Sequence, residues 1–269
     1  MAERVQKFLA ARGLGSRREI ESWIERGDVL VNGRVAKLGD QVGPHDAVQV
    51  RGRAVRAEAL AHRWLVYHKP EGEICSRSDP EGRVSVFAAL PRLRGQRWVA
   101  VGRLDLNTSG LLLFTTDGAL ANALMHPSRG LVREYAVRVL GELSEQSRRS
   151  LLDGIELDDG SARFESLTEA GGEGANRWFH VTVSEGRNRL VRRLWEAAGV
   201  TVSRLIRIRY GPVVLGRGLK AGHFRELEAD EVRALYTAAG MAPPRPERPQ
   251  PRSRKPGKLV PSTRQRRRS

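Results

Sequence analysis

Short apolar runs that end at turn-forming residues constrain the fold of this chain more than any other feature. These runs cover residues 63–70, 111–116, 135–141 and 178–186. Runs of this length that are bounded by Gly or Pro are typical of β-strands. Residues 119–127 show helical spacing instead, with Asp117 as the expected N-cap. The sequence therefore predicts an α+β fold whose larger domain holds a mixed, mainly antiparallel sheet.

A separate small module is predicted at the amino-terminal end. Apolar residues at helical spacing indicate a first helix that ends at Gly13 or Gly15. Ser16 is followed three residues later by Glu19, which is the pattern of a capping box at the start of a second helix. Gly27 is expected to end that helix. The module is thus predicted to contain two helices followed by a β-hairpin.

Three arginines of this module are candidates for binding phosphate. Arg17 and Arg18 occupy the first turn of the second helix, where the helix macrodipole disfavours cations by about a few tenths of a kcal/mol. Helix amino-terminal amides and two guanidinium groups suit a phosphate, and Arg34 beside the expected Asn32-Gly33 turn extends the site. A solvated basic face is the alternative. Residues 51–63 are interpreted as a polar linker.

The charge of the chain favours a polyanionic partner. Its 47 Lys and Arg residues exceed its 31 Asp and Glu residues, which gives a net charge of +16. Residues 243–269 hold eight Arg and two Lys against one Glu, so this segment carries +9 of that total. Its prolines and scarcity of large apolar residues predict a disordered basic tail that contacts phosphates or serves only solubility.

Several classes of chemistry lack their usual sequence signals. No glycine-rich phosphate loop follows any predicted strand, and the single cysteine, Cys75, cannot build a cysteine-rich zinc site. The six histidines never fall at ligand spacing. We therefore expect no metal and no cofactor. Neither a secretory signal nor a membrane span is recognisable, so a cytoplasmic protein is expected by default.

One carboxylate stands alone in an otherwise turn-rich stretch. Asp105 has no acidic neighbour before Asp117, so the paired carboxylates of an ordinary glycoside hydrolase are missing locally. Further along, residues 190–198 predict an amphipathic helix on which Arg192 and Arg193 flank the apolar face on opposite sides. One of these arginines is expected to enter a cleft and the other to face solvent, and periodicity alone does not decide which.

Four stretches carry a resemblance to a known family. The chain resembles the pseudouridine synthases that modify ribosomal RNA in GRLDLNTSGLLLFTTDG, in REYAVRV and in EGRNRLVRRLWEAAGVTVSRLIRIRYGP. The amino-terminal run SRREIESWIERGDVLVNGRV resembles the S4 RNA-binding module. The resemblance implies an enzyme that isomerises uridine in ribosomal RNA, most closely in the peptidyl-transferase region of the large subunit. Such a reaction consumes no redox cofactor, metal or nucleotide.

The resemblance also implies roles for four residues of the larger domain. Asp105 corresponds to the catalytic carboxylate, and Tyr135 to the aromatic side chain that stacks against the target base. Arg192 corresponds to a cation paired with Asp105, and Arg103 to a side chain that helps to hold the RNA strand. The pattern departs from the family at Arg133, where lysine is common.

Leu190 stands where the family commonly has a polar residue, which is expected to alter how the helix contacts RNA. The alternatives are a non-catalytic RNA-binding or ribosome-assembly factor and a nucleoside glycosidase. A uracil methyltransferase that uses a thiolate is disfavoured, because no base is evident near the single cysteine, Cys75. The expected organisation is an RNA-binding module with its linker (1–60), a catalytic domain (61–242) and the tail (243–269), in a monomer.

Overall fold

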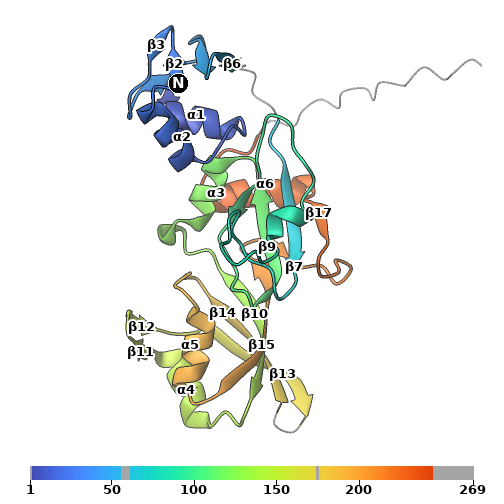
Figure 1. Ribbon diagram of the computed structural model, residues 1–269. Helices are drawn as coiled ribbons and strands as arrows, with labels where there is room; N and C mark the ends of the chain where they lie inside the picture. Colours follow the sequence, from blue (N-terminus) through green and yellow to red (C-terminus); the bar gives the residue numbers. More distant parts are fainter. Residues whose placement is uncertain (1, 56–60, 174–175, 245–269) are drawn as a thin grey trace, which may run out of the picture.

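The computed structural model describes residues 2–55, 61–173 and 176–244 (Figure 1). The basic tail predicted over 243–269 therefore lies almost entirely outside the described residues, as do residues 56–60 of the predicted linker. Across the described ranges, no helix is both long and apolar enough to cross a membrane.

The amino-terminal module has two helices and short strands around its own core. It comprises β1 (Glu3–Arg4), α1 (Val5–Ala11), α2 (Arg17–Glu25), β2 (Val29–Val31), β3 (Arg34–Val35), β4 (Gln41–Val42), β5 (Val48–Val50) and β6 (Arg53–Val55). The Ser16–Glu19 capping box begins α2 as predicted. Val31 pairs with Arg34 across Asn32 and Gly33, which confirms the two-residue hairpin turn. The core residues are Val5, Phe8, Leu9, Ile20, Ile24, Val29, Ala36, Val42 and Val48.

The start of the predicted linker belongs to this module instead. Residues 53–55 form β6 and pair with β5, so the interpretation of 51–63 as a linker is wrong for these residues. The turn places Arg51 at φ 49°, a conformation for which arginine gives no sequence signal. The Arg51 side chain donates to Asp28 and lies over the ring of Trp23, contacts that stabilise the turn.

The larger domain is built on one nine-stranded sheet in the order β13-β14-β10-β15-β9-β7-β17, with β8 and β16 attached to β9 and β15. The strands are β7 (Trp64–Lys69), β8 (Val99–Val101), β9 (Ser109–Thr115), β10 (Arg133–Leu140), β13 (Ser166–Glu173), β14 (Asn176–Val183), β15 (Thr201–Tyr210), β16 (Val213–Val214) and β17 (Phe224–Glu226). All pairs are antiparallel except β15 with β9. The predicted α+β fold with a mixed, mainly antiparallel sheet is confirmed.

Helices cover the two halves of this sheet differently (Figure 1). The remaining elements are η1 (Val86–Ala89), α3 (Gly118–Met125), η2 (Pro127–Arg129), α4 (Glu145–Asp153), β11 (Ile155–Leu157), β12 (Gly160–Ala162), α5 (Leu190–Ala197) and α6 (Ala229–Ala238). Helices α3 and α6 cover one face of the β7–β9 half, in a core that includes Leu120 and Tyr236. A second core follows the opposite face across both halves and includes Phe114, Val137 and Trp195 of α5.

The two halves meet at a short parallel contact. Only Ile206 with Ser109 and Arg207 with Gly110 are paired between β15 and β9. A Cβ atom on Gly110 would lie 2.3 Å from the carbonyl oxygen of Arg207, and the φ of Gly110 is +108°. Both facts require glycine at this position. The close approach brings the segment that precedes β9 against β15.

The outermost strand, β13, contains an irregularity. Its register with β14 shifts between Glu169 and Gly172, which marks a β-bulge. A Cβ atom on Gly172 would lie 2.3 Å from the carbonyl oxygen of Asn176, so the bulge also depends on a glycine.

Candidate active site

Asp105 lies in the loop between β8 and β9, immediately before the contact between the two half-sheets. The loop is closed by a hydrogen bond of 3.1 Å from the Thr108 amide to the Asp105 carbonyl. A second bond of 2.9 Å runs from the Gly72 amide to the Leu106 carbonyl. These bonds fix the backbone, while the Asp105 side chain lines a cleft of about 740 Å³.

The cleft brings together three of the residues predicted from sequence. Arg103, Asp105 and Tyr135 all line it. Tyr135 lies on β10, where it is paired with Val181 on one side and Arg207 on the other, and its side chain is 9% exposed. Arg103 is exposed, two residues before Asp105. The structure therefore places a carboxylate, an aromatic ring and an exposed cation around one opening.

The cleft is strongly cationic. Its lining includes five arginines, namely Arg103, Arg133, Arg187, Arg189 and Arg207. Asp105 and Glu185 are the two carboxylates among its described lining residues. Glu185 accepts two hydrogen bonds from Arg187, at 2.6 and 3.0 Å, so part of its charge is already balanced. This balance of charge suits an anionic ligand.

A buried lysine that sequence reasoning missed supports the Asp105 loop. Lys69, at the end of β7, has no exposed surface. Its Nζ donates to the carbonyls of Pro70, Leu106 and Thr108 at 2.9, 3.3 and 2.9 Å. Burial lowers its pKa, whereas nearby acidic groups that include Asp105 raise it. The sequence signal that could have identified Lys69 is a lysine at the end of a predicted strand that is mostly apolar.

Arg192 supports the same loop but does not form the expected direct pair with Asp105. Its guanidinium donates to the carbonyls of Asn107 at 2.7 Å and Val202 at 3.2 Å. No carboxylate among the described residues lies within 4.0 Å of it. Burial, followed by the charge of Arg189, lowers the pKa of Arg192, and the charge of Asp105 raises it. Arg192 thus contacts the backbone of the Asp105 loop rather than the Asp105 carboxylate.

Of the two arginines of α5, one points inward and the other faces solvent, as the sequence predicted. Arg192 is 8% exposed and points inward. Arg193 points outward, where its Nη1 donates to Asp159 Oδ2 at 2.9 Å. Asp159 also accepts a bond of 3.0 Å from Arg187, and these contacts lower its pKa to about 2.

Cys75 borders the cleft as a protonated thiol. Its Sγ lies 3.3 Å from the Leu104 carbonyl, to which it donates, and 3.4 Å from the Leu104 amide, from which it accepts. Burial raises the pKa of Cys75. A thiol of raised pKa is a poor nucleophile, which disfavours the methyltransferase hypothesis.

The two departures from the family pattern both have structural roles. Arg133 donates to the carbonyls of Leu131 and Ser184 at 3.1 and 3.0 Å, and so joins two sides of the cleft. Leu190 is 3% exposed and packs into the main core at the base of α5. It also lines the cleft that contains Asp105, so an apolar side chain stands there in place of a polar one.

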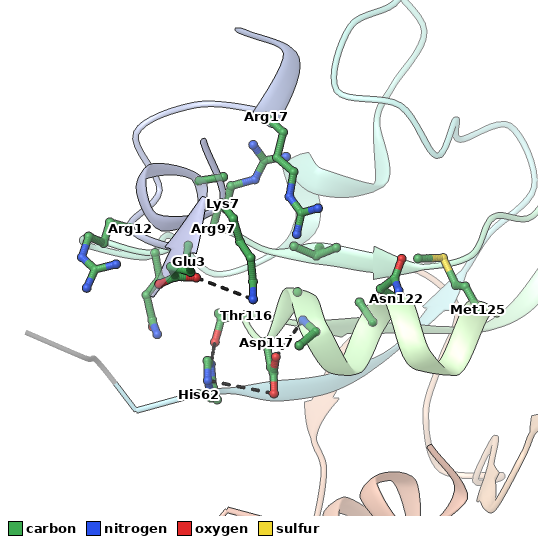
Figure 2. A pocket seen from close by; sticks show the side chains of 18 residues that line it. Glu3, Lys7, Arg12, Arg17, His62, Arg97, Thr116, Asp117, Asn122 and Met125 are labelled. Atoms are coloured by element: carbon green, nitrogen blue, oxygen red, sulfur yellow. Dashed lines mark hydrogen bonds and ion pairs between the residues drawn. The ribbon is translucent and has the colours of Figure 1, made fainter. Parts of the chain in front are cut away.

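A second cleft, of about 560 Å³, lies between α1 and α3 and includes one predicted RNA-binding arginine. Figure 2 shows Lys7 and Arg17 from the amino-terminal module facing Asn122 and Asp117 of the larger domain. Arg97 lines the same cleft and donates to the Gly15 carbonyl at 2.6 Å, which joins the module to the larger domain.

The other two predicted arginines of the module lie elsewhere. Arg18 and Arg34 are exposed, and neither lines the cleft that contains Asp105 or the one that contains Arg17. The structure therefore does not gather the three predicted RNA-binding arginines of the module into a single pocket.

The chain is similar to known RNA-modifying proteins. The RNA pseudouridylate synthase family matches residues 63–197, and the S4 domain family matches residues 3–48. A Pseudomonas aeruginosa protein named ribosomal large subunit pseudouridine synthase B is 55% identical over 247 residues, which cover 90% of this chain and 64% of that protein. The chain thus spans slightly less than two thirds of this relative.

Two further matches cover a larger share of the related protein's length. An Escherichia coli protein of the same name is 54% identical over 248 residues, which cover 90% of this chain and 85% of that protein. A crystal structure of a pseudouridylate synthase has a TM-score of 0.61 and 26% identity, and the match covers 86% of this chain and 99% of that one.

Proposed function

This chain belongs to the RNA pseudouridylate synthase family, and we propose that it converts a uridine of large-subunit ribosomal RNA to pseudouridine. The observation that carries the proposal is that Asp105 and Tyr135 line one cleft together with five arginines. The names of the relatives supply the ribosomal large subunit as the source of the substrate.

The proposed reaction explains why a single free carboxylate is sufficient. The bond between C1′ of the ribose and N1 of uracil breaks, the base turns, and a bond forms between C1′ and C5. The base loses the proton at C5 and gains one at N1, so substrate and product are isomers. Asp105 either attacks the sugar or the ring covalently or removes a proton from the sugar. None of these roles needs a partner carboxylate.

The target uridine must leave its stack to reach Asp105. Flipping a nucleotide costs about a few kcal/mol, and stacking on an aromatic side chain recovers part of this cost. Tyr135 lines the cleft and supplies that ring. Arg103 is exposed beside Asp105 and is the proposed contact to the strand from which the base has left.

The amino-terminal module is the proposed docking device. Arg17, Arg18 and Arg34 are exposed and would contact phosphates of structured RNA. Lys7 and Arg97 line the second cleft together with Arg17, so a phosphate in this cleft would contact both the module and the larger domain (Figure 2).

Asp105→Asn tests the function directly. The substitution keeps the shape of the side chain and removes the reactive carboxylate. We expect single-turnover conversion of uridine in a large-subunit ribosomal RNA fragment to fall at least 1,000-fold, on the order found for loss of catalytic groups. The affinity for RNA is expected to stay within about threefold, because phosphate contacts dominate it.

Glu185→Gln is the matched comparison, because Glu185 is the other carboxylate of the cleft. We expect this variant to keep its rate within about tenfold. An equal loss of rate in both variants would favour the hypothesis of a glycosidase that uses paired carboxylates. An Asp105→Asn variant that remains active within tenfold would remove Asp105 from the proposed role.

A further inference from the structure

Arg207, on β15, is a buried cation whose hydrogen-bonding capacity is mostly unused. It is 2% exposed, and its Nε donates to the Leu111 carbonyl at 2.8 Å. Leu111 is the only hydrogen-bond acceptor of this guanidinium among the described residues, and Nη2 is buried without a partner. No described carboxylate lies within 4.0 Å of it. Guanidinium has five N–H donors, so most of them have no protein acceptor among the described residues.

The protein compensates for this burial only in part. The Cζ atom of Arg207 lies 5.2 Å from the ring centroid of Tyr210, a cation–π distance. The Cζ atom of Arg133 lies at a similar distance, 5.1 Å, from the centroid of the same ring, so the Tyr210 ring is shared by two cations. A buried charge without an ion pair is costly. A ligand that supplies an acceptor would therefore gain a hydrogen bond that the free protein cannot make.

The backbone directs Arg207 toward the position of a flipped base. Arg207 is directly opposite Tyr135 in the antiparallel pair of β15 and β10, so both side chains lie on the same face of the sheet. Both line the cleft that contains Asp105. On its other side Arg207 is paired with Gly110, whose missing side chain allows the end of the Asp105 loop to approach.

The depth of Arg207 distinguishes between the acceptors that RNA offers. Arg103 is exposed beside the cleft, where backbone phosphates of a docked strand would lie. Arg207 is almost fully buried, so only the part of the nucleotide that enters the cleft can reach it. That part is the base, whose hydrogen-bond acceptors include the carbonyl oxygens O2 and O4.

We infer that Arg207 binds a carbonyl oxygen of the flipped uracil through an outer guanidinium nitrogen. The inference rests on the proposed function. When the bond between C1′ and N1 breaks, its electron pair passes to the base and is shared by N1, O2 and O4. A fixed cation at a carbonyl oxygen stabilises this charge as it develops, in the manner of an oxyanion hole. The charge disappears when C5 has bonded to C1′, the C5 proton has left and N1 is protonated.

Arg207→Met tests this contact, with Arg209→Met as its matched control. Arg209 lies on the same strand and pairs instead with Glu134 at 2.7 Å. We expect Arg207→Met to lower the single-turnover rate at saturating protein concentration, called the plateau, by about 100-fold, as for loss of one oxyanion donor. The control should stay within about threefold. Tritium released from C5 of the target uridine measures the rate.

Thiouridine substrates then identify the acceptor. The uridine that the wild-type protein modifies is replaced by 2-thiouridine or by 4-thiouridine in the same RNA fragment, because sulfur is a weak acceptor. Replacement of the contacted oxygen should slow the wild-type protein but should not slow Arg207→Met further. If the rate loss caused by sulfur and the rate loss caused by Arg207→Met multiply with both 2-thiouridine and 4-thiouridine, the proposed contact is wrong.

Stability separates a role in binding from a role in folding. Because Arg207→Met removes a buried charge without an ion pair, its melting temperature should equal or exceed that of the wild-type protein. A variant that melts lower, and whose activity returns fully when it is assayed at lower temperature, would mean that Arg207 is only structural. If Arg207→Met does not fold, Arg207→Leu, which also lacks a donor, is used in the same thiouridine comparison, with the same expected result. A wild-type protein that releases no tritium would reject the proposed function itself.

Discussion

The cations of the amino-terminal module and those around Asp105 differ in their surroundings. Arg17, Arg18 and Arg34 are exposed on the module. Around the loop of Asp105, Arg103 is exposed, but three further cations are buried, with exposed fractions of 0% for Lys69, 8% for Arg192 and 2% for Arg207. Between them, the buried cations donate to the carbonyls of every residue from Leu106 to Thr108 and of Leu111.

This difference in exposure implies a difference in function. Exposed cations release counterions when they bind phosphate, so their contribution to affinity decreases with salt. Buried cations that donate to backbone carbonyls are screened much less, and they determine where the loop lies. Under the proposed function, the net charge of +16 therefore combines residues expected to contribute RNA affinity with residues expected to position the Asp105 loop.

Within this comparison of buried and exposed cations, the largest effect is expected from two neighbours on α5. Arg192→Met removes the donors to Asn107 and Val202 and should lower the single-turnover plateau by about 100-fold, because the Asp105 loop loses its support. Arg193→Met removes only contacts made at the surface, to Asp159 and the Asn188 carbonyl, and should stay within about threefold.

The RNA affinity of Arg192→Met should be unchanged at every salt concentration, because Arg192 is predicted to contact no phosphate. Arg192→Lys keeps the charge and should recover part of the rate. Equal rates for Arg192→Met and Arg193→Met would show that burial of the cation is unimportant for the chemistry.

A smaller effect, on affinity, is expected for the exposed cations. Arg17→Glu combined with Arg18→Glu should raise the half-saturating protein concentration about tenfold and leave the plateau unchanged, because charge reversal repels phosphate outside the cleft that contains Asp105. The slope of log affinity against log salt should decrease by about two units, one for each lost contact. A lower plateau in the folded variant would mean that the module helps to assemble the active site.

The smallest effect concerns an exposed carboxylate and stability at acid pH. The contacts of Asp159 with Arg193 and Arg187 lower its pKa from 3.8 to about 2. Ionised Asp159 therefore stabilises the fold above about pH 4, and this contribution is lost as the pH falls from about 4 through 2. Melting temperatures of wild-type protein and Asp159→Asn should converge over this interval. Parallel curves down to pH 2 would contradict the contribution of Asp159.

Features governed by neighbours in sequence could be predicted. The Ser16–Glu19 capping box, the Asn32-Gly33 turn and the Asp117 N-cap of α3 are all present. Each depends on side-chain and backbone groups within a few residues. Strand β6 could not be predicted in the same way, because its turn places Arg51 in a conformation that this residue type rarely adopts.

Features governed by distant segments were less accessible. The position of Asp105 beside Tyr135 was suggested by resemblance, and no periodicity could place β9 and β10 on either side of β15. The bonds of Lys69 and Arg192 to the Asp105 loop span 37 to 85 residues of sequence. Sequence patterns identified the amphipathic helix that carries Arg192, but they could not show that a carbonyl rather than Asp105 accepts its hydrogen bond.

The bulge in β13 has a consequence for the behaviour of concentrated protein. A long, flat outer strand exposes a row of unpaired amides and carbonyls on which a strand of another molecule can assemble. The bulge between Glu169 and Gly172 interrupts that row, and the ion pair of Glu169 with Arg177 puts charge on the same margin. The edge of the sheet formed by β13 is thereby protected against edge-to-edge aggregation.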